Sequence, residues 1–176
     1  MRQVLARVDA SLTDLARLGE LPLGNGDVIR VLDALTSASS RLTRELCRAV
    51  AEADRRRLGD AIGARHTHQW WAARSRHTHG DAARLTRLGR AFEDDLHAPT
   101  ARALADGRLR VEQARVIVDA VDAIPTTVRV SDGTTRIIDP SARMQARDHL
   151  LDAAGEHDSK ALRRLGRRIL EVVAPE

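Results

Sequence analysis

Apolar residues recur every three or four positions along most of this chain, which is the spacing of amphipathic α-helices. The pattern is clearest over residues 78–125, where we expect three helices in close succession. Their apolar stripes are Leu85, Leu88, Phe92 and Leu96 on the first, Ala101, Leu104 and Ala105 on the second, and Val111, Ala114, Ile117, Val118, Val121 and Ile124 on the third. We therefore predict an all-α fold whose core includes Leu85, Leu88, Phe92, Leu104, Ile117 and Val121.

Residues that begin and end helices agree with this prediction. Thr78, followed three positions later by Asp81, resembles a capping box at the start of the first of these helices. Pro99 suits the first turn of the second helix, where its missing N–H has no partner to lose. Gly107 suits the position just past the end of that helix, where a left-handed backbone is needed.

The N-terminal part of the chain reads as two helices. Residues 2–18 carry one apolar stripe, and Asp27 can cap a longer helix that runs to about Arg56. The seam of the longer helix alternates steps of four and three, through Val28, Leu32, Leu35, Ser39, Leu42, Leu46, Ala49 and Ala53. That heptad spacing predicts an antiparallel helical hairpin over residues 1–56. The same seam could instead form a homodimer, because the longer helix extends beyond its 17-residue neighbour.

The remaining segments complete a single domain of about seven helices. Residues 57–125 form the core region, including a short helix that Thr67 caps. Residues 126–139 alternate apolar and polar positions around Asp132-Gly133, which predicts a small β-hairpin near residues 127–138 or an exposed loop. Residues 140–174 should form two C-terminal helices, the first opened by Pro140 and Ser141 and the last capped by Ser159.

Composition narrows the class of protein. The chain of 176 residues has one Phe, two Trp and no Tyr, so the core must be mainly aliphatic. A single cysteine, Cys47, excludes an intramolecular disulfide and a cysteine-rich zinc site. No apolar run is long enough for a membrane span or a signal peptide. We therefore expect a cytoplasmic protein without a membrane partner.

The net charge of +4 is unevenly distributed, with a basic middle and a basic C-terminal helix on either side of an acidic block. On the C-terminal helix, one side is apolar and the other is cationic. The cationic side carries Lys160, Arg163, Arg164, Arg167 and Arg168. This side is the best candidate in the chain for contact with DNA phosphates, although a solvated helix end has the same composition.

Other clusters of polar residues predict no catalytic residue, metal or cofactor. His66 and His68, like His77 and His79, are two positions apart, which places them on opposite sides of a helix. The acidic run 93–95 fans around a helix axis, and Arg90 should pair with Glu93 or Asp94. No catalytic triad, glycine-rich phosphate loop or zinc-binding cysteine pair is present in the sequence.

A helix-turn-helix over residues 99–124 is a further alternative, because the helix lengths fit. Its second helix would expose Glu112, Asp119 and Asp122 against only Arg115, which disfavours binding to a polyanion. Packing inside the domain is the better interpretation. Stacking of Trp71 against a nucleic-acid base is possible chemically, but partial burial is the more ordinary role for an indole.

One run is similar to the actinobacterial domain of unknown function 222, the thirteen-E-twelve repeat family: LHAPTARALADGRLRVEQARVIVDAV, residues 96–121. The resemblance extends over roughly residues 27–174. Trp70 matches the tryptophan of the family and should be the core anchor, whereas Trp71 stands where leucine is usual. Arg110 stands where the family has a capping Ser or Thr, which would leave the following helix without its customary cap.

The resemblance implies a function. Members of the family usually carry a C-terminal HNH endonuclease domain, and the HNH motif is not in this sequence. This chain would then be a non-catalytic helical module that positions DNA or a partner subunit, and not an enzyme by itself. The alternative is a helical scaffold that mediates homo-oligomerisation without binding nucleic acid.

Overall fold

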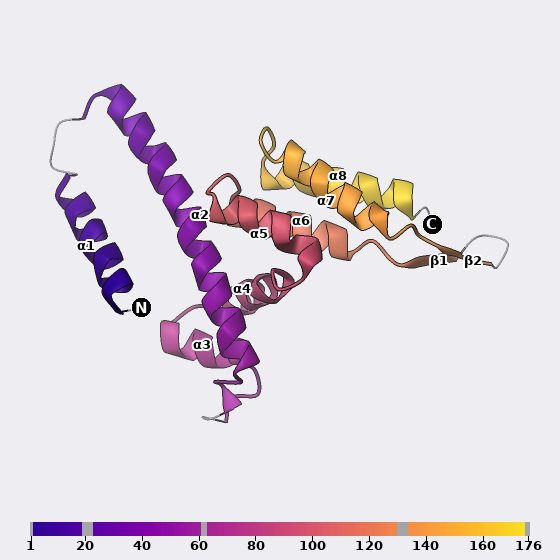
Figure 1. Cartoon of the computed structure of the whole chain (residues 1–176), viewed down its shortest axis with the longest axis horizontal. Helices are drawn as coiled ribbons and strands as arrows, with labels where there is room; N and C mark the ends of the chain where they lie inside the picture. The colour runs from indigo at the N-terminus through magenta and orange to yellow at the C-terminus, as the bar shows by residue number, and fades with distance from the viewer. Residues whose placement is uncertain (1, 19–22, 61–62, 130–133, 175–176) are drawn as a thin grey trace. The chain divides into compact units, whose positions relative to one another are not determined.

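The computed structural model describes residues 2–18, 23–60, 63–129 and 134–174. It divides into two compact units, residues 1–35 and residues 36–176. The prediction of an all-α fold with a small hairpin is confirmed (Figure 1). The helices are α1 (Arg2–Leu18), α2 (Asn25–Arg55), α3 (Thr67–Ser75), α4 (His79–Ala91), α5 (Ala98–Ala105), α6 (Val111–Asp122), α7 (Ser141–Ala153) and α8 (Ser159–Val173), and a short 3₁₀ turn, η2 (Asp95–His97), precedes α5.

The two strands β1 (Thr127–Arg129) and β2 (Thr135–Ile137) pair in antiparallel fashion. Val128 lies opposite Arg136 in the middle of this ladder. The β-hairpin alternative for residues 127–138 is therefore the correct one. Val130 and the expected turn at Asp132-Gly133 lie outside the described residues.

The first unit contains α1 and the beginning of α2, and its apolar residues are largely exposed to solvent. The antiparallel hairpin expected over residues 1–56 stays a prediction. The exposed large apolar residues of this unit are Val4, Leu5, Val8, Leu12, Leu23, Val28, Ile29, Val31, Leu32 and Leu35.

The second unit is built around α6, which packs against α4, α5, α7 and α8. Three sides of α6 are apolar, so Ala114, Ile117, Val118 and Val121 are all buried. This burial agrees with packing inside the domain, and the residues of α6 that remain exposed, Glu112, Asp119 and Asp122, are acidic and disfavour insertion into a DNA groove. The main core also takes in Cys47, Leu88, Phe92, Ala101, Ala103, Leu104, Leu109, Val116, Ile124, Ile138, Ala146, Leu150, Ala154 and Leu162.

A smaller cluster lies beside the main core and contains Val50, Trp71, Ala72 and Ala82. The prediction that Trp70 anchors the core is wrong, because Trp71 is the buried indole and Trp70 is half-buried. Adjacent residues point about 100° apart on a helix, so only one of the two can face inward. Leu85, expected in the core, is also only partly buried and packs against both clusters.

Several helix ends differ from the sequence-based expectation. Leu96 lies in η2 and not on the first helix of the core region, because α4 ends at Ala91 and the Asp94 carboxylate accepts the Leu96 N–H at 2.8 Å. Thr78 does cap α4, accepting the Asp81 N–H at 3.0 Å. Thr67 is the first residue of α3, whose N-cap position belongs to His66.

The turn between α5 and α6 is fixed by a glycine and an arginine. Gly107 has φ of +74°, which confirms its left-handed role after α5. Arg110 does not cap α6 with its side chain, but its backbone N–H donates to Gln113 Oε1 at 2.8 Å, so the helix start is not left without a partner. The Arg110 guanidinium donates to Ser40 Oγ at 3.1 Å and to the Gly107 carbonyl at 2.8 Å. Arg110 therefore ties the turn to α2.

Candidate nucleic-acid interface

The start of α8 is set by an acidic cap. Asp158 Oδ1 accepts the Ala161 N–H at 2.7 Å, and this backbone hydrogen bond lowers the pKa of the Asp158 carboxyl. The expectation that Ser159 is the cap is therefore wrong, since Ser159 is the first residue inside the helix. An ionised carboxylate at this end also interacts favourably with the helix dipole.

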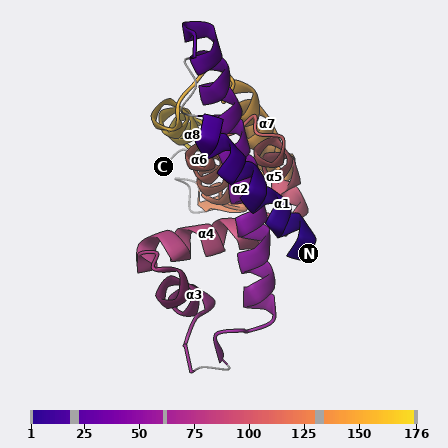
Figure 2. The same ribbon diagram turned by 90° about the vertical axis from the view of Figure 1, so that its left-hand side faces the viewer.

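The apolar side of α8 fixes how the helix is rotated. Leu162 is completely buried, and Leu165 and Ile169 pack against the same core. Gly166 lies so close to α6 that a Cβ on it would be 2.7 Å from the Ala120 Cβ. Figure 2 shows α8 beside α6 in this arrangement. Because one side is held against α6 and α7, the opposite side must face solvent.

That outward side carries a line of cations, which we call the α8 basic face: Lys160, Arg163, Arg164, Arg167 and Arg168. All five residues are exposed. At 1.5 Å per residue the face extends over about 12 Å of helix. Within the part of the chain that the structure describes, the only one in an ion pair is Arg168, whose Nη1 lies 3.6 Å from Glu171 Oε2. The face therefore retains most of its positive charge.

A shallow groove of about 220 Å³ separates the edge of this face from α6. Arg163 and Arg167 border it on one side and Asp119 on the other. Asp119 is itself paired with Arg87 of α4, so its carboxylate is already neutralised. The groove thus adds little negative charge to oppose an approaching phosphate.

The two histidine pairs are arranged differently from the sequence-based expectation. The prediction that His66 and His68 face opposite sides is wrong, because their rings stack with centroids 5.2 Å apart. His66 lies outside α3, with an extended backbone (φ −142°, ψ 143°), so helical spacing does not apply to it. Among the residues the structure describes, no group of three His, Cys, Asp or Glu side chains could hold a metal ion.

The expected pairing of Arg90 with Glu93 or Asp94 is also replaced by another. Arg90 Nε donates to Asp54 Oδ2 at 2.5 Å, which links α4 to α2. Glu93 and Asp94 lie beyond the end of α4, so the spacing that brings helical neighbours together is lost. The hydrogen bond from Arg90 lowers the pKa of the Asp54 carboxyl. This pair is structural.

Trp71 is not available to stack on a base. Only 9% of Trp71 is exposed, and its ring lies 4.8 Å from the His77 ring.

His97 was not among the residues predicted to be functional. It is buried, and its Nε2 lies 2.9 Å from Asp122 Oδ1. Its only sequence signal is its place between Leu96 and Ala98, just before α5.

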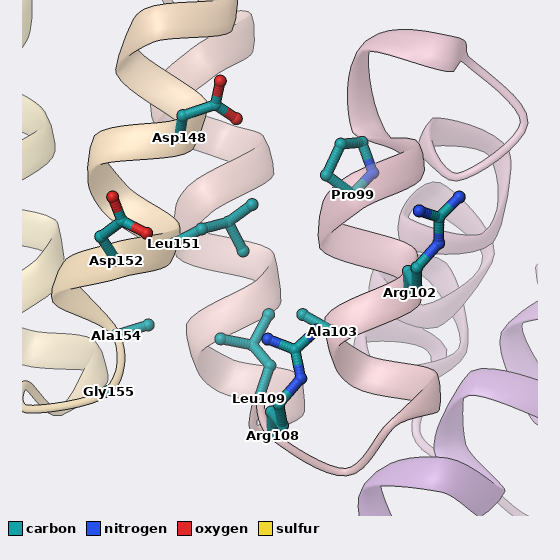
Figure 3. A pocket seen from close by; sticks show the side chains of 10 residues that line it. All are labelled: Pro99, Arg102, Ala103, Arg108, Leu109, Asp148, Leu151, Asp152, Ala154 and Gly155. Atoms are coloured by element: carbon teal, nitrogen blue, oxygen red, sulfur yellow. The ribbon is translucent and has the colours of Figure 1, made fainter.

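A larger groove of about 680 Å³ lies between α5 and α7 (Figure 3). Arg102 and Arg108 lie on one side of it and Asp148 and Asp152 on the other, across an apolar floor. Arg108 pairs with Asp106, and Asp148 pairs with Arg147. The groove thus has both signs of charge, and half of these charges are already satisfied. The α8 basic face remains the stronger candidate for binding a polyanion.

Comparison with known proteins adds one result. Searches of curated proteins and of solved structures give no match. No helix within the described part of the chain is sufficiently long and apolar to cross a membrane. Residues 29–176, which include the whole core around α6 and the α8 basic face, match the family described as "Domain of unknown function (DUF222)". The chain therefore belongs to the DUF222 family.

Proposed function

We propose that this chain is a non-catalytic helical module that positions DNA through the α8 basic face. The observation that carries the proposal is a row of five exposed cations, four of which form no ion pair with any described residue. Some other exposed arginines of the chain have a carboxylate neighbour, as Arg48 has in Glu45. Asp119, which lies across the groove from Arg163 and Arg167, is paired with Arg87, whereas Asp158 interacts electrostatically with Lys160 and Arg164 without forming an ion pair.

The chemistry of these side chains suits phosphate. Four of the five are arginines, whose planar guanidinium can donate two parallel hydrogen bonds to one phosphate group. A face of about 12 Å spans roughly four phosphates of one strand, which are about 3.4 Å apart along the helix axis. Such contacts give affinity and orientation but do not read sequence. We therefore propose duplex DNA, bound without strong sequence preference.

The reaction on that DNA would belong to another domain. The DUF222 family resemblance implies an HNH endonuclease, and we propose that such a domain cuts the DNA that this module holds. In this arrangement the α8 basic face supplies binding energy and orientation, and no side chain of this chain takes part in the chemical step.

The proposal is tested by the salt dependence of binding to a short duplex. If about four phosphates are contacted, affinity should fall roughly 100-fold between 50 and 200 mM salt. Replacement of Arg163, Arg164, Arg167 and Arg168 by Gln should abolish binding and flatten this dependence. Because all four side chains are exposed, the helical circular dichroism signal should not change.

A matched control removes the same charge elsewhere. Arg7, Arg41, Arg129 and Arg136 are also exposed and form no ion pair with a described residue. Their replacement by Gln lowers the net charge equally and should leave most of the DNA affinity. Equal losses in the two variants would mean that only the net charge matters. Absence of any DNA binding at low salt would reject the proposal and favour the scaffold alternative. The exposed apolar residues in the first unit support that alternative.

A further inference from the structure

We propose that two copies of this chain associate through the first unit, with α1 and the beginning of α2 of each copy forming one four-helix bundle. The surface involved, which we call the N-terminal apolar face, comprises Val4, Leu5, Val8, Leu12, Val28, Ile29, Val31 and Leu35. This proposal is independent of DNA binding, because it concerns different residues and a different kind of contact.

The exposure of this face is the first observation. Leu5 and Ile29 are each 60% exposed, and Val4 and Leu12 are about half exposed. Single exposed apolar side chains are ordinary, but a monomer rarely exposes so many large ones within two short helical segments. On α1 they fall on one stripe, at intervals of three and four residues. A surface of this kind is stable in water only when another apolar surface covers it.

The periodicity of α2 indicates that the covering surface is helical. Val28, Leu35, Leu42 and Ala49 recur every seven residues, which is the repeat of helices packed side by side. Ile29 and Val31 flank this repeat and widen the apolar side beyond a narrow coiled-coil seam. A wide side is typical of a helix that contacts two neighbours, as each helix does in a four-helix bundle.

The charges of the unit favour a second copy over a charged partner. Its described residues include four arginines and four aspartates: Arg2, Arg7, Arg17, Arg30, Asp9, Asp14, Asp27 and Asp33. Two of the aspartates already pair within their own helix, with Arg17 and Arg30. Two copies therefore meet without net repulsion. A polyanion or an anionic lipid surface gains no net attraction, because surface-binding helices carry an excess of Lys and Arg.

The size of the unit also fits. The 17 residues of α1 together with residues 25–35 of α2 are comparable with the roughly 20–30 residues that each partner contributes to a standard interface. In a two-fold dimer the same patch occurs on both sides, so a self-complementary apolar face with balanced charges meets the geometric requirement.

The test is sedimentation velocity of the whole chain from about 1 to 100 µM, a range suited to micromolar association. The unmodified chain should dimerise. A variant with Leu12→Asp and Ile29→Asp should sediment as a monomer, with the dimer Kd raised at least about 100-fold, because charges would be buried at the interface. The matched control is Ile137→Asp, which alters a 76% exposed isoleucine outside the first unit and should leave the dimer intact.

Three results would overturn the proposal: a monomer at every concentration, equal loss of dimer in the Ile137→Asp control, or a solution monomer that binds phosphatidylserine vesicles through the same residues. Circular dichroism of the double variant adds a check on folding. Since both replaced side chains are exposed, its helical signal should match that of the unmodified chain. A dimer that persists with the α8 arginines replaced by Gln separates this proposal from DNA binding.

Discussion

The side chain of Gln113 holds together the elements that place α8, and its replacement is the sharpest test of the packing described above. Gln113 is buried near the start of α6. Its Nε2 donates to the carbonyls of Ala154 and His157, at 2.9 and 2.8 Å, and its Oε1 accepts the Arg110 N–H at 2.8 Å. One amide thus joins the start of α6 to both ends of the connection between α7 and α8.

Gln113→Met keeps the approximate volume and removes all three hydrogen bonds. The Ala154 carbonyl is buried and would lose its partner, which costs about 1–3 kcal/mol. The Arg110 N–H and the His157 carbonyl are only partly buried, so water can replace some of what they lose. We expect the free energy of unfolding to fall by about 2–4 kcal/mol, which for a chain of this size lowers Tm by roughly 5–15 °C.

Gln113→Glu separates hydrogen bonding from packing. The glutamate can still accept the Arg110 N–H, but its second oxygen would face two carbonyl oxygens. An ionised carboxylate there is unfavourable, so the pKa of the glutamate should be raised in the folded state. A raised pKa means that stability is retained at low pH and lost as the pH rises through the folded-state value. The variant should therefore be more stable relative to the unmodified chain at pH 5 than at pH 8.

The assay is urea unfolding followed by circular dichroism. Gln145→Met is the matched control, because Gln145 is exposed and its hydrogen bond to Ser141 lies at the surface. This control should change the free energy of unfolding by less than about 0.5 kcal/mol. If Gln113→Met costs no more than Gln145→Met, the amide does not hold the connection between α7 and α8, and the reasoning is refuted.

Two further predictions concern the interior. Gly166→Ala places a Cβ against Ala120 of α6, so overpacking should outweigh the gain in helix propensity. The variant should be less stable by about 1 kcal/mol in urea unfolding, whereas the control Gly155→Ala should be neutral. Equal effects of the two substitutions would contradict the close approach of α8 to α6. The Cys47 thiol is fully buried, and burial raises its pKa to about 11. The neutral thiol therefore contributes fully to stability below 9.0, the pKa of the thiol in the unfolded chain, and this contribution is lost as the pH rises through about 11. Cys47 should react with a thiol reagent at pH 8 only after unfolding, and rapid labelling of the native chain would contradict this.

Much of the fold was predictable because local rules determined it. The apolar spacing identified the core of α6, and Thr78 and Gly107 marked real helix ends. The alternation of residues around position 128 indicated the β-hairpin. In each of these cases the physical cause lies within a few residues of the chain, where sequence spacing carries the information.

The errors have tertiary causes. Whether Trp70 or Trp71 enters the core depends on how α3 is rotated against α2 and α4, which its own sequence does not set. Arg90 finds Asp54, 36 residues away, because α4 ends too early for a local partner. The stacked rings of His66 and His68 arise because one of them lies outside the helix. Each outcome requires knowledge of neighbouring elements.

The exposure of the cations on α8 was predictable from the sequence. The cations of the α8 basic face are exposed, as the helical spacing indicated. One side of α8 is apolar and the other is cationic, so the helix can pack against the core in only one rotation about its axis. What the spacing could not indicate was that, among the described residues, Arg168 is the only cation of this face in an ion pair. The pairing of Asp119 with Arg87 depends on the packing of α4 against α6.

The contact between Gly166 and Ala120 has an evolutionary consequence. Because the docking of α8 depends on small residues and on Leu162 at its inner side, the residues at its outer side contribute almost nothing to folding. Related chains can therefore exchange these outer arginines for other polar residues one at a time without losing the fold. The ligand preference of the module can change by mutation while its architecture stays constant.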